Sequence, residues 1–120
     1  MGMPARVDLA RLREFSDGTP EGLRELVEVF LSDSAQTMRE LAAAVREGAA
    51  AQVELLAHRA GGSSAACGAA RLSDLLFDLE RLGRARAVAG AGDVMRAAEA
   101  EFVEIQAVLG AHLGKTQDRR

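Results

Sequence analysis

The chain has 120 residues, with 15 Lys and Arg against 18 Asp and Glu, and its formal net charge is -3. This mildly acidic balance, together with an aromatic content of 3%, argues against a nucleic-acid partner, which would require a basic surface and stacking rings. No segment approaches the roughly 20 apolar residues that span a bilayer, and the N-terminus lacks the apolar region of a secretion signal, so we expect no membrane partner and a cytoplasmic location.

The first half of the sequence carries two helical patterns. Alanine, leucine, arginine and glutamate dominate and no strand-like alternation is visible, which favours an all-α fold. Apolar residues over the range 9–15 predict a short first helix that ends near Asp17-Gly18. Thr19-Pro20-Glu21 then predicts a helix start, with an N-cap hydroxyl, a proline at the first helical position and an early acid. This long helix ends at Gly48, and its stripe comprises Leu23, Val27, Phe30, Ser34, Met38, Leu41 and Val45.

The second half carries three more helical patterns. A helix of about Ala50 to Cys67 is broken by Gly68-Ala69, and the next helix has a leucine stripe, Leu72, Leu75, Leu76 and Leu79. After a loop at residues 90–92, Asp93 is the candidate N-cap of a final helix. The stripe of that helix comprises Val94, Ala98, Phe102, Ile105 and Leu109.

Four substantial amphipathic helices with short connections predict an antiparallel up-and-down four-helix bundle. We expect the short additional N-terminal helix to cover one end of it. The chain is interpreted as a single domain over residues 1–120, with a helical core at about 8–113 and a polar C-terminal tail at 114–120.

His58 lies in the third predicted helix among unusually small side chains. At about 100° per residue, its side of the helix carries Ala51, Glu54, Leu55, Gly61, Gly62 and Ala65. The opposite arc suits packing against other helices and carries Val53, Leu56, Ala57, Ala60, Ser63, Ser64 and Cys67, the last interpreted as a small buried hydrophobe. His58 is therefore predicted to face outward. Two adjacent glycines cost a helix roughly 2 kcal/mol relative to alanines, so we interpret Gly61 and Gly62 as clearance for a large partner.

The segment His58-Arg59-Ala60-Gly61-Gly62-Ser63-Ser64-Ala65-Ala66-Cys67-Gly68-Ala69 resembles the motif of the histidine phosphotransfer domain family. That motif reads His, two residues, Lys, Gly, Ser or Ala, Ser, three residues, Gly. The match includes the histidine, the second glycine, the serine pair and the terminal Gly-Ala, and a leucine-rich stretch follows. This chain departs from the family at Gly61, where the family usually has lysine.

The resemblance implies a phosphorelay carrier. His58 would accept a phosphoryl group from a receiver-domain aspartate and pass it to another receiver, without an ATP site and without a cofactor of its own. The implied partners are response-regulator receiver domains, which would carry the Mg²⁺, and a hybrid histidine kinase. We expect a monomer.

Glu80 is the candidate orienting residue. In a hairpin that turns at Gly68-Ala69, Glu80 is expected at the height of His58, where its carboxylate can accept a hydrogen bond from Nδ1–H and leave Nε2 free to attack. The resemblance also implies a polar residue facing the histidine at this offset. Glu54, one turn before His58, is the alternative contact, and a solvated Glu80 is the other possibility.

The candidate receiver-docking surface consists of the outward residues Glu54, Leu55, Arg59, Gly61, Gly62 and Ala65. Leu55 is either part of a docking patch or partly buried against a neighbouring helix. Without a lysine at position 61, Arg59 and Arg84 are the nearest cations for a phosphoryl group, and we expect a lysine at position 61 to be tolerated. His112 is interpreted as incidental.

Three other functions compete with the phosphoryl carrier. A degenerate module that binds receivers or kinases without accepting phosphate is the main alternative, because the usual lysine is missing. A metal-binding bundle would need an inward cluster of histidines and carboxylates, and the sequence shows no such pattern. An autonomous kinase would need a glycine-rich nucleotide loop with an associated lysine, which is also not found.

Overall fold

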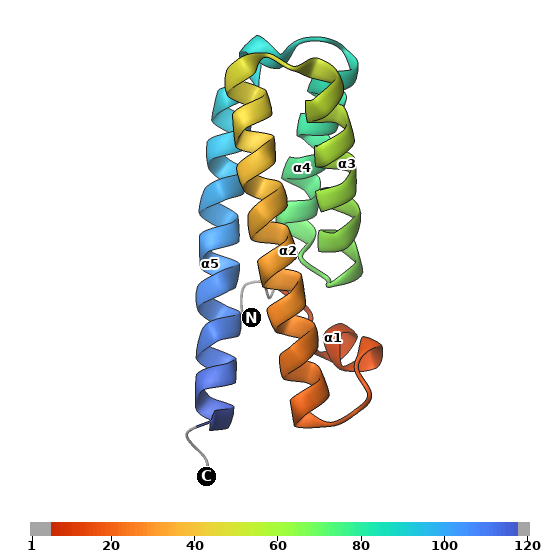
Figure 1. Ribbon diagram of the computed structural model, residues 1–120, viewed down its shortest axis with the longest axis vertical. Helices are drawn as coiled ribbons and strands as arrows, with labels where there is room; N and C mark the ends of the chain where they lie inside the picture. Colours follow the sequence, from red (N-terminus) through yellow and green to blue (C-terminus); the bar gives the residue numbers. More distant parts are fainter. Residues whose placement is uncertain (1–5, 118–120) are drawn as a thin grey trace, which may run out of the picture.

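The computed structural model describes residues 6–117, and the side chains of residues 6–111. Within this range the elements are α1 (Leu9–Phe15), α2 (Pro20–Glu47), α3 (Ala50–Ala66), α4 (Ala70–Arg84), the 3-10 turn η1 (Val88–Gly90) and α5 (Gly92–Gln117). The four long helices run alternately up and down, and α1 lies beside the lower part of α2, below the α3–α4 hairpin (Figure 1). The predicted all-α antiparallel four-helix bundle with a short additional helix is confirmed. No helix of the described part combines the length and apolarity that crossing a membrane requires.

The ends of α2 follow from local chemistry. The Thr19 hydroxyl accepts a hydrogen bond from the Gly22 N–H at 2.9 Å, and Pro20 occupies the first helical position. At the other end Gly48 adopts a φ of 69°, in the left-handed region that glycine enters without a steric penalty. Both predicted ends of this helix are confirmed.

Other boundaries differ from the sequence-based expectation. The third helix ends at Ala66, one residue early, and Gly68 turns the chain with a φ of 73°. The last helix begins at Gly92, because the Met95 N–H already donates to the Ala91 carbonyl at 2.9 Å, so Asp93 lies within the first turn and is not the N-cap.

The last helix is also longer than predicted. It continues through Gln117, past Gly114, so the expected polar tail is helical over residues 114–117. Residues 118–120 and the side chain of His112 lie outside the described part.

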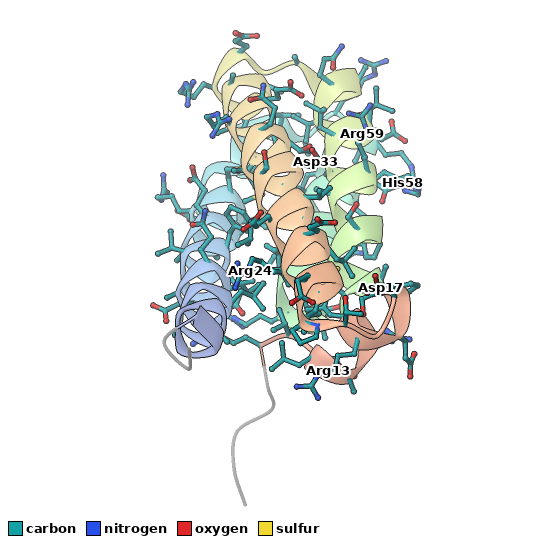
Figure 2. The ribbon with its side chains drawn as sticks, turned by 60° about the horizontal axis from the view of Figure 1, so that its bottom comes forward. Arg13, Asp17, Arg24, Asp33, His58 and Arg59 are labelled. Carbon is teal, nitrogen blue, oxygen red and sulfur yellow. The ribbon has the colours of Figure 1, made fainter. Side chains whose placement is uncertain are left out.

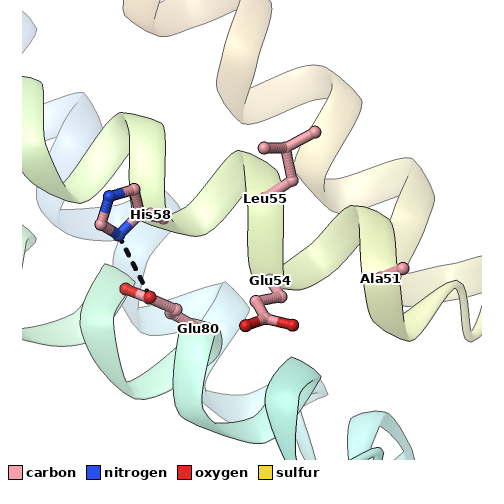
Figure 3. A pocket seen from close by; sticks show the side chains of 5 residues that line it. All are labelled: Ala51, Glu54, Leu55, His58 and Glu80. Carbon is pink, nitrogen blue, oxygen red and sulfur yellow. Dashed lines mark hydrogen bonds and ion pairs between the residues drawn. The ribbon is translucent and has the colours of Figure 1, made fainter.

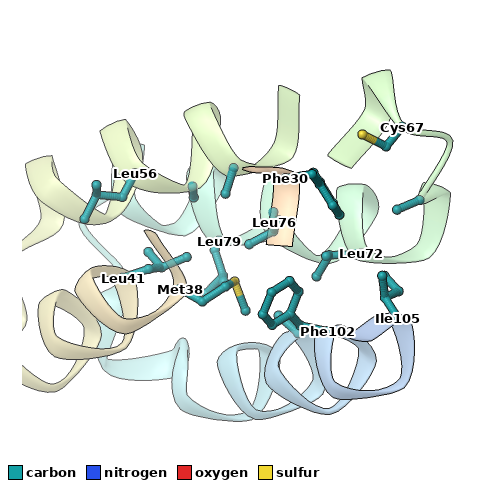
Figure 4. Close-up of a cluster of buried hydrophobic side chains, with 14 of the residues drawn as sticks. Phe30, Met38, Leu41, Leu56, Cys67, Leu72, Leu76, Leu79, Phe102 and Ile105 are labelled. Atoms are coloured by element: carbon teal, nitrogen blue, oxygen red, sulfur yellow. The ribbon is translucent and has the colours of Figure 1, made fainter. Parts of the chain in front are cut away.

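The hydrophobic core lies between the four long helices, each of which contributes one apolar stripe (Figure 4). Met38 and Phe102 lie beside leucines of α4, and Leu56 of α3 belongs to the same core. Cys67 is buried as predicted, and burial raises the pKa of its thiol. The fully buried large side chains are Leu12, Val27, Leu41, Val53, Leu72, Leu76, Leu79, Ile105 and Leu109.

The N-terminal segment is attached to the lower end of the α3–α4 hairpin. The Asp8 N–H donates to the Cys67 carbonyl at 3.2 Å, and Arg6 pairs with Glu101 on α5. Glu101 is only 4% exposed, and Arg71 at the start of α4 reaches the same carboxylate oxygen at 3.4 Å. A buried carboxylate is stable only with such partners, so this cluster ties α4, α5 and the N-terminal segment together.

The α3–α4 pair is closely packed because glycine replaces a side chain at the contact. A Cβ atom added at Gly83 would lie 2.6 Å from the backbone nitrogen of Glu54 and 2.8 Å from the carbonyl oxygen of Ala50. No Cβ atom fits at those distances, so α4 rests directly on the backbone of α3. This contact fixes the separation of the two helices and their relative height.

We therefore predict that Gly83→Ala destabilises the fold by about 1–3 kcal/mol, because the methyl group meets backbone that cannot rotate away. Gly110→Ala is the matched control in α5, where an added Cβ meets nothing within 4 Å, and it should be neutral or stabilising by up to about 1 kcal/mol. Urea denaturation measures both. Equal stability of Gly83→Ala and the wild type would show that the close approach is not required.

Candidate functional site

His58 projects from the outer side of α3 (Figure 2), and its side chain is 70% exposed. Its ring borders a shallow hollow lined by Ala51, Glu54, Leu55 and Glu80 (Figure 3). Gly62, one turn further along α3, is exposed and an added Cβ there meets nothing within 4 Å. The predicted outward orientation of His58 is confirmed, and the approach over Gly62 is open.

Glu80 is hydrogen-bonded to Nδ1 of the His58 imidazole. Nδ1 of His58 lies 3.1 Å from Oε2 of Glu80, whose side chain is 12% exposed (Figure 3). An ionised carboxylate can only accept, so this hydrogen bond requires the proton on Nδ1. In the neutral ring the lone pair then belongs to Nε2, the nitrogen that does not contact Glu80. The contact is the one predicted from the hairpin register.

Arg84 connects the two carboxylates of the site. Its Nε donates to Oε2 of Glu54 at 3.0 Å, and one Nη donates to Oε2 of Glu80 at 2.7 Å. The hydrogen bond to Glu54, together with the negative charges of Glu54 and Glu80, raises the pKa of Arg84. Glu54 thus bonds to Arg84, and the alternative contact between Glu54 and His58 is not formed.

Gly61 is buried and does not belong to the outward surface, which corrects the prediction from the helical wheel. A Cβ added at Gly61 would lie 2.7 Å from Cε1 of Phe77 in α4, so the glycine makes room for that ring. The Phe77 ring lies 6.5 Å from the His58 ring, tilted by 52°. Gly61 lies on the flank of α3 against which α4 packs, and a lysine there would have to displace Phe77. A lysine at position 61 is therefore accommodated only if the partly exposed Phe77 ring moves.

The other candidate docking residues differ in exposure. Leu55 is 54% exposed, and Arg59 is exposed as well. Ala65 is partly buried, and its carbonyl accepts a hydrogen bond from Arg11 of α1 at 3.1 Å. Ser63, predicted on the packing side, is exposed. Of the six predicted docking residues, Leu55, Arg59 and Gly62 are thus exposed, Glu54 and Ala65 are partly buried, and Gly61 is buried.

Sequence reasoning missed Phe77 and Gly83, and it placed Arg84 near a phosphoryl group without its carboxylate partners. The hairpin register that predicted Glu80 could have found all three. Gly61 and Phe77 are separated from the Gly68-Ala69 turn by similar numbers of residues, and so are Glu54 and Arg84. Among the described side chains, no group of three or more His, Cys, Asp or Glu is arranged to hold a metal ion.

Comparisons with known proteins bear on the family and the fold of the chain. A family model described as the Hpt domain matches residues 25–111. A solved structure, the histidine-containing phosphotransfer protein B from Pseudomonas aeruginosa PAO1, is similar with a TM-score of 0.84 and 23% sequence identity, over 94% of this chain and 98% of that one. No curated protein sequence gives a significant match.

We predict that Gly→Ala substitutions at positions 61 and 62 change the stability of the fold in opposite directions. Gly62→Ala should stabilise the fold by up to about 1 kcal/mol, because the helix gains propensity and the site is open. Gly61→Ala should leave the protein less stable than Gly62→Ala by about 1–3 kcal/mol, because the methyl displaces the Phe77 ring. Thermal or urea denaturation measures the difference.

A Phe77→Ala background provides the control for this pair. The penalty at position 61 should disappear there, since the clashing ring is gone. If the two glycine variants were equally stable in the wild-type background, Gly61 would not be needed for packing.

Proposed function

Because the chain belongs to the Hpt domain family, whose members are histidine phosphotransfer proteins of phosphorelays, we propose that His58 accepts a phosphoryl group from a receiver-domain aspartate and passes it to another receiver. The observation that carries this proposal is the imidazole of His58, which is exposed to solvent while its Nδ1 is hydrogen-bonded to Glu80. The protein is a carrier in this scheme, without an ATP site of its own.

The transfer step requires no base in this chain. The lone pair of Nε2 attacks the phosphorus of the aspartyl phosphate, an Nε2–P bond forms, and the O–P bond breaks with its electron pair going to the aspartate carboxylate. The proton stays on Nδ1, so the ring becomes a phosphorylated imidazolium. The reverse sequence, with a second aspartate as the attacking group, returns the phosphoryl group and restores the neutral ring.

Glu80 is proposed to act as the positioning residue for this step. Its carboxylate accepts the Nδ1–H bond before transfer and faces the positive charge that develops on the ring during transfer. Because Glu80 is mostly buried, the interaction is less screened by solvent than a surface ion pair. Leu55, Arg59 and Gly62 form the proposed docking surface, and the receiver supplies the Mg²⁺ and most of the charge stabilisation.

The first test is the site of phosphorylation. Incubation with a phosphorylated receiver should give an acid-labile, alkali-stable adduct on the wild type and none on His58→Gln, whereas ATP alone should give no label. His112 is the other histidine of the chain, and its substitution is the control that should leave labelling intact. Label that survives in His58→Gln would contradict the assignment, and receiver binding without any label would instead support the docking module.

The second test concerns Glu80. Glu80→Ala should slow single-turnover transfer by about 3- to 30-fold, which corresponds to about 1–2 kcal/mol for one hydrogen bond to a charged group. Glu80→Gln keeps an oxygen acceptor and should lose less than Glu80→Ala. Transfer at the wild-type rate in Glu80→Ala would show that the carboxylate does not position the ring.

A further inference from the structure

The cation that the family motif places three residues after the histidine is absent from this chain, which has Gly61 there, with the Phe77 ring packed against it. Position 61 faces Phe77, and a Cβ atom there would lie 2.7 Å from Cε1 of that ring, so any side chain at this position requires the ring to shift. Arg59, the nearest cation in sequence, is the neighbour of His58 in a helix and therefore points about 100° away from it. The positive charge that the structure does hold beside the imidazole is Arg84, which shares Oε2 of Glu80 with Nδ1 of His58.

We propose that Arg84 exchanges its hydrogen bond to Glu54 for one to the phosphoryl group when His58 is phosphorylated, and so supplies the cation that position 61 does not. The inference rests on the proposed function, since it concerns the phosphorylated state of the same histidine. Arg84 is a positioning residue of the resting site and becomes a ligand of the phosphoryl oxygens.

The charges of the site favour the exchange. In the resting state two carboxylates, one guanidinium and a neutral imidazole lie together, so the group has one excess negative charge. Phosphorylation adds a dianionic phosphoryl group and one positive charge on the ring, which increases the excess. A guanidinium bonds phosphate oxygens through paired N–H groups, so moving Arg84 toward the new charge lowers the repulsion.

The geometry makes the exchange a local movement. Arg84 is on α4 and 62% exposed, so its side chain can rotate in solvent without opening the core. Its bond to Oε2 of Glu80, the oxygen that also faces Nδ1 of His58, can persist while Nε releases Glu54, which is itself partly exposed. Glu54 is therefore the competitor for Arg84, and Glu80 is the residue that keeps the guanidinium in reach.

The exchange sets the lifetime of the phosphohistidine. In hydrolysis the phosphoryl group passes through a loose state that resembles metaphosphate and carries less total charge than the bound dianion. A cation on the phosphoryl oxygens therefore stabilises the phosphohistidine more than the transition state. Arg84 should slow spontaneous hydrolysis, and Glu54 should oppose that effect by competing for it.

The test uses the full chain phosphorylated with phosphoramidate, a small donor that needs no receiver, and follows the half-life of phosphohistidine by ³¹P NMR. Arg84→Gln should shorten the half-life by about 3- to 10-fold, the loss expected for one charge-assisted hydrogen bond. Glu54→Gln should lengthen it, because Arg84 loses its competitor. Arg81→Gln is the matched control, since Arg81 lies on the same helix, is exposed and pairs with Asp78, and it should leave the half-life unchanged.

The double variant Glu54→Gln/Arg84→Gln separates the exchange from a simple change of local charge. If Glu54 acts through Arg84, the double variant decays at the rate of Arg84→Gln alone. An unchanged phosphohistidine half-life in Arg84→Gln would overturn the exchange. So would a Glu54→Gln substitution that lengthens the half-life equally in the wild-type and Arg84→Gln backgrounds. Because phosphoramidate labels the histidine directly, a failure of receiver transfer would count against the proposed function and not against this inference, whereas an unlabelled wild type would contradict both.

Discussion

The close approach of α3 to α4 is the constraint on which the site depends. At Gly83 the absence of a side chain lets α4 rest on the backbone of α3, and at Gly61 it lets the Phe77 ring fit between the two helices. Two such contacts along one hairpin leave no freedom for either helix to slide. The fixed register places Glu80 at the height of His58, with 3.1 Å between the bonded atoms. A polar contact on the surface is thus determined by packing in the layer beneath it.

The two helices of the hairpin contribute different parts of the site. In the proposed function, the third helix presents the nucleophile His58 beside the small exposed residue Gly62, and the fourth helix supplies the groups that orient the imidazole. Glu80 keeps the proton on Nδ1, Phe77 borders the ring, and Arg84 balances the carboxylates. Such a site is complete as an acceptor but contains little catalytic machinery of its own, which suits a carrier whose partner performs the chemistry.

Much of the fold could be predicted because its signals are local. The caps at Thr19 and Gly48 and the leucine stripe of α4 depend on a few neighbouring residues, and the structure has them where the sequence indicated. The position of Glu80 beside His58 could be predicted as well, since a tight turn fixes heights in a hairpin. Gly61 was misinterpreted because a helical wheel gives directions around one helix without saying where the next helix packs. The Phe77 ring packs against Gly61, whereas the space at Gly62 is open, as the proposed access to His58 requires, and only the neighbouring residues distinguish the two glycines.

The central claim is that the packed hairpin fixes the tautomer of His58 and so selects the nucleophilic nitrogen. Long-range ¹H–¹⁵N NMR of the unphosphorylated protein, at a pH where the ring is neutral, measures this directly, because protonated and unprotonated ring nitrogens have widely separated shifts. We expect a protonated Nδ1 and an unprotonated Nε2, and loss of this preference in Glu80→Ala. A ring protonated mainly on Nε2 would contradict it.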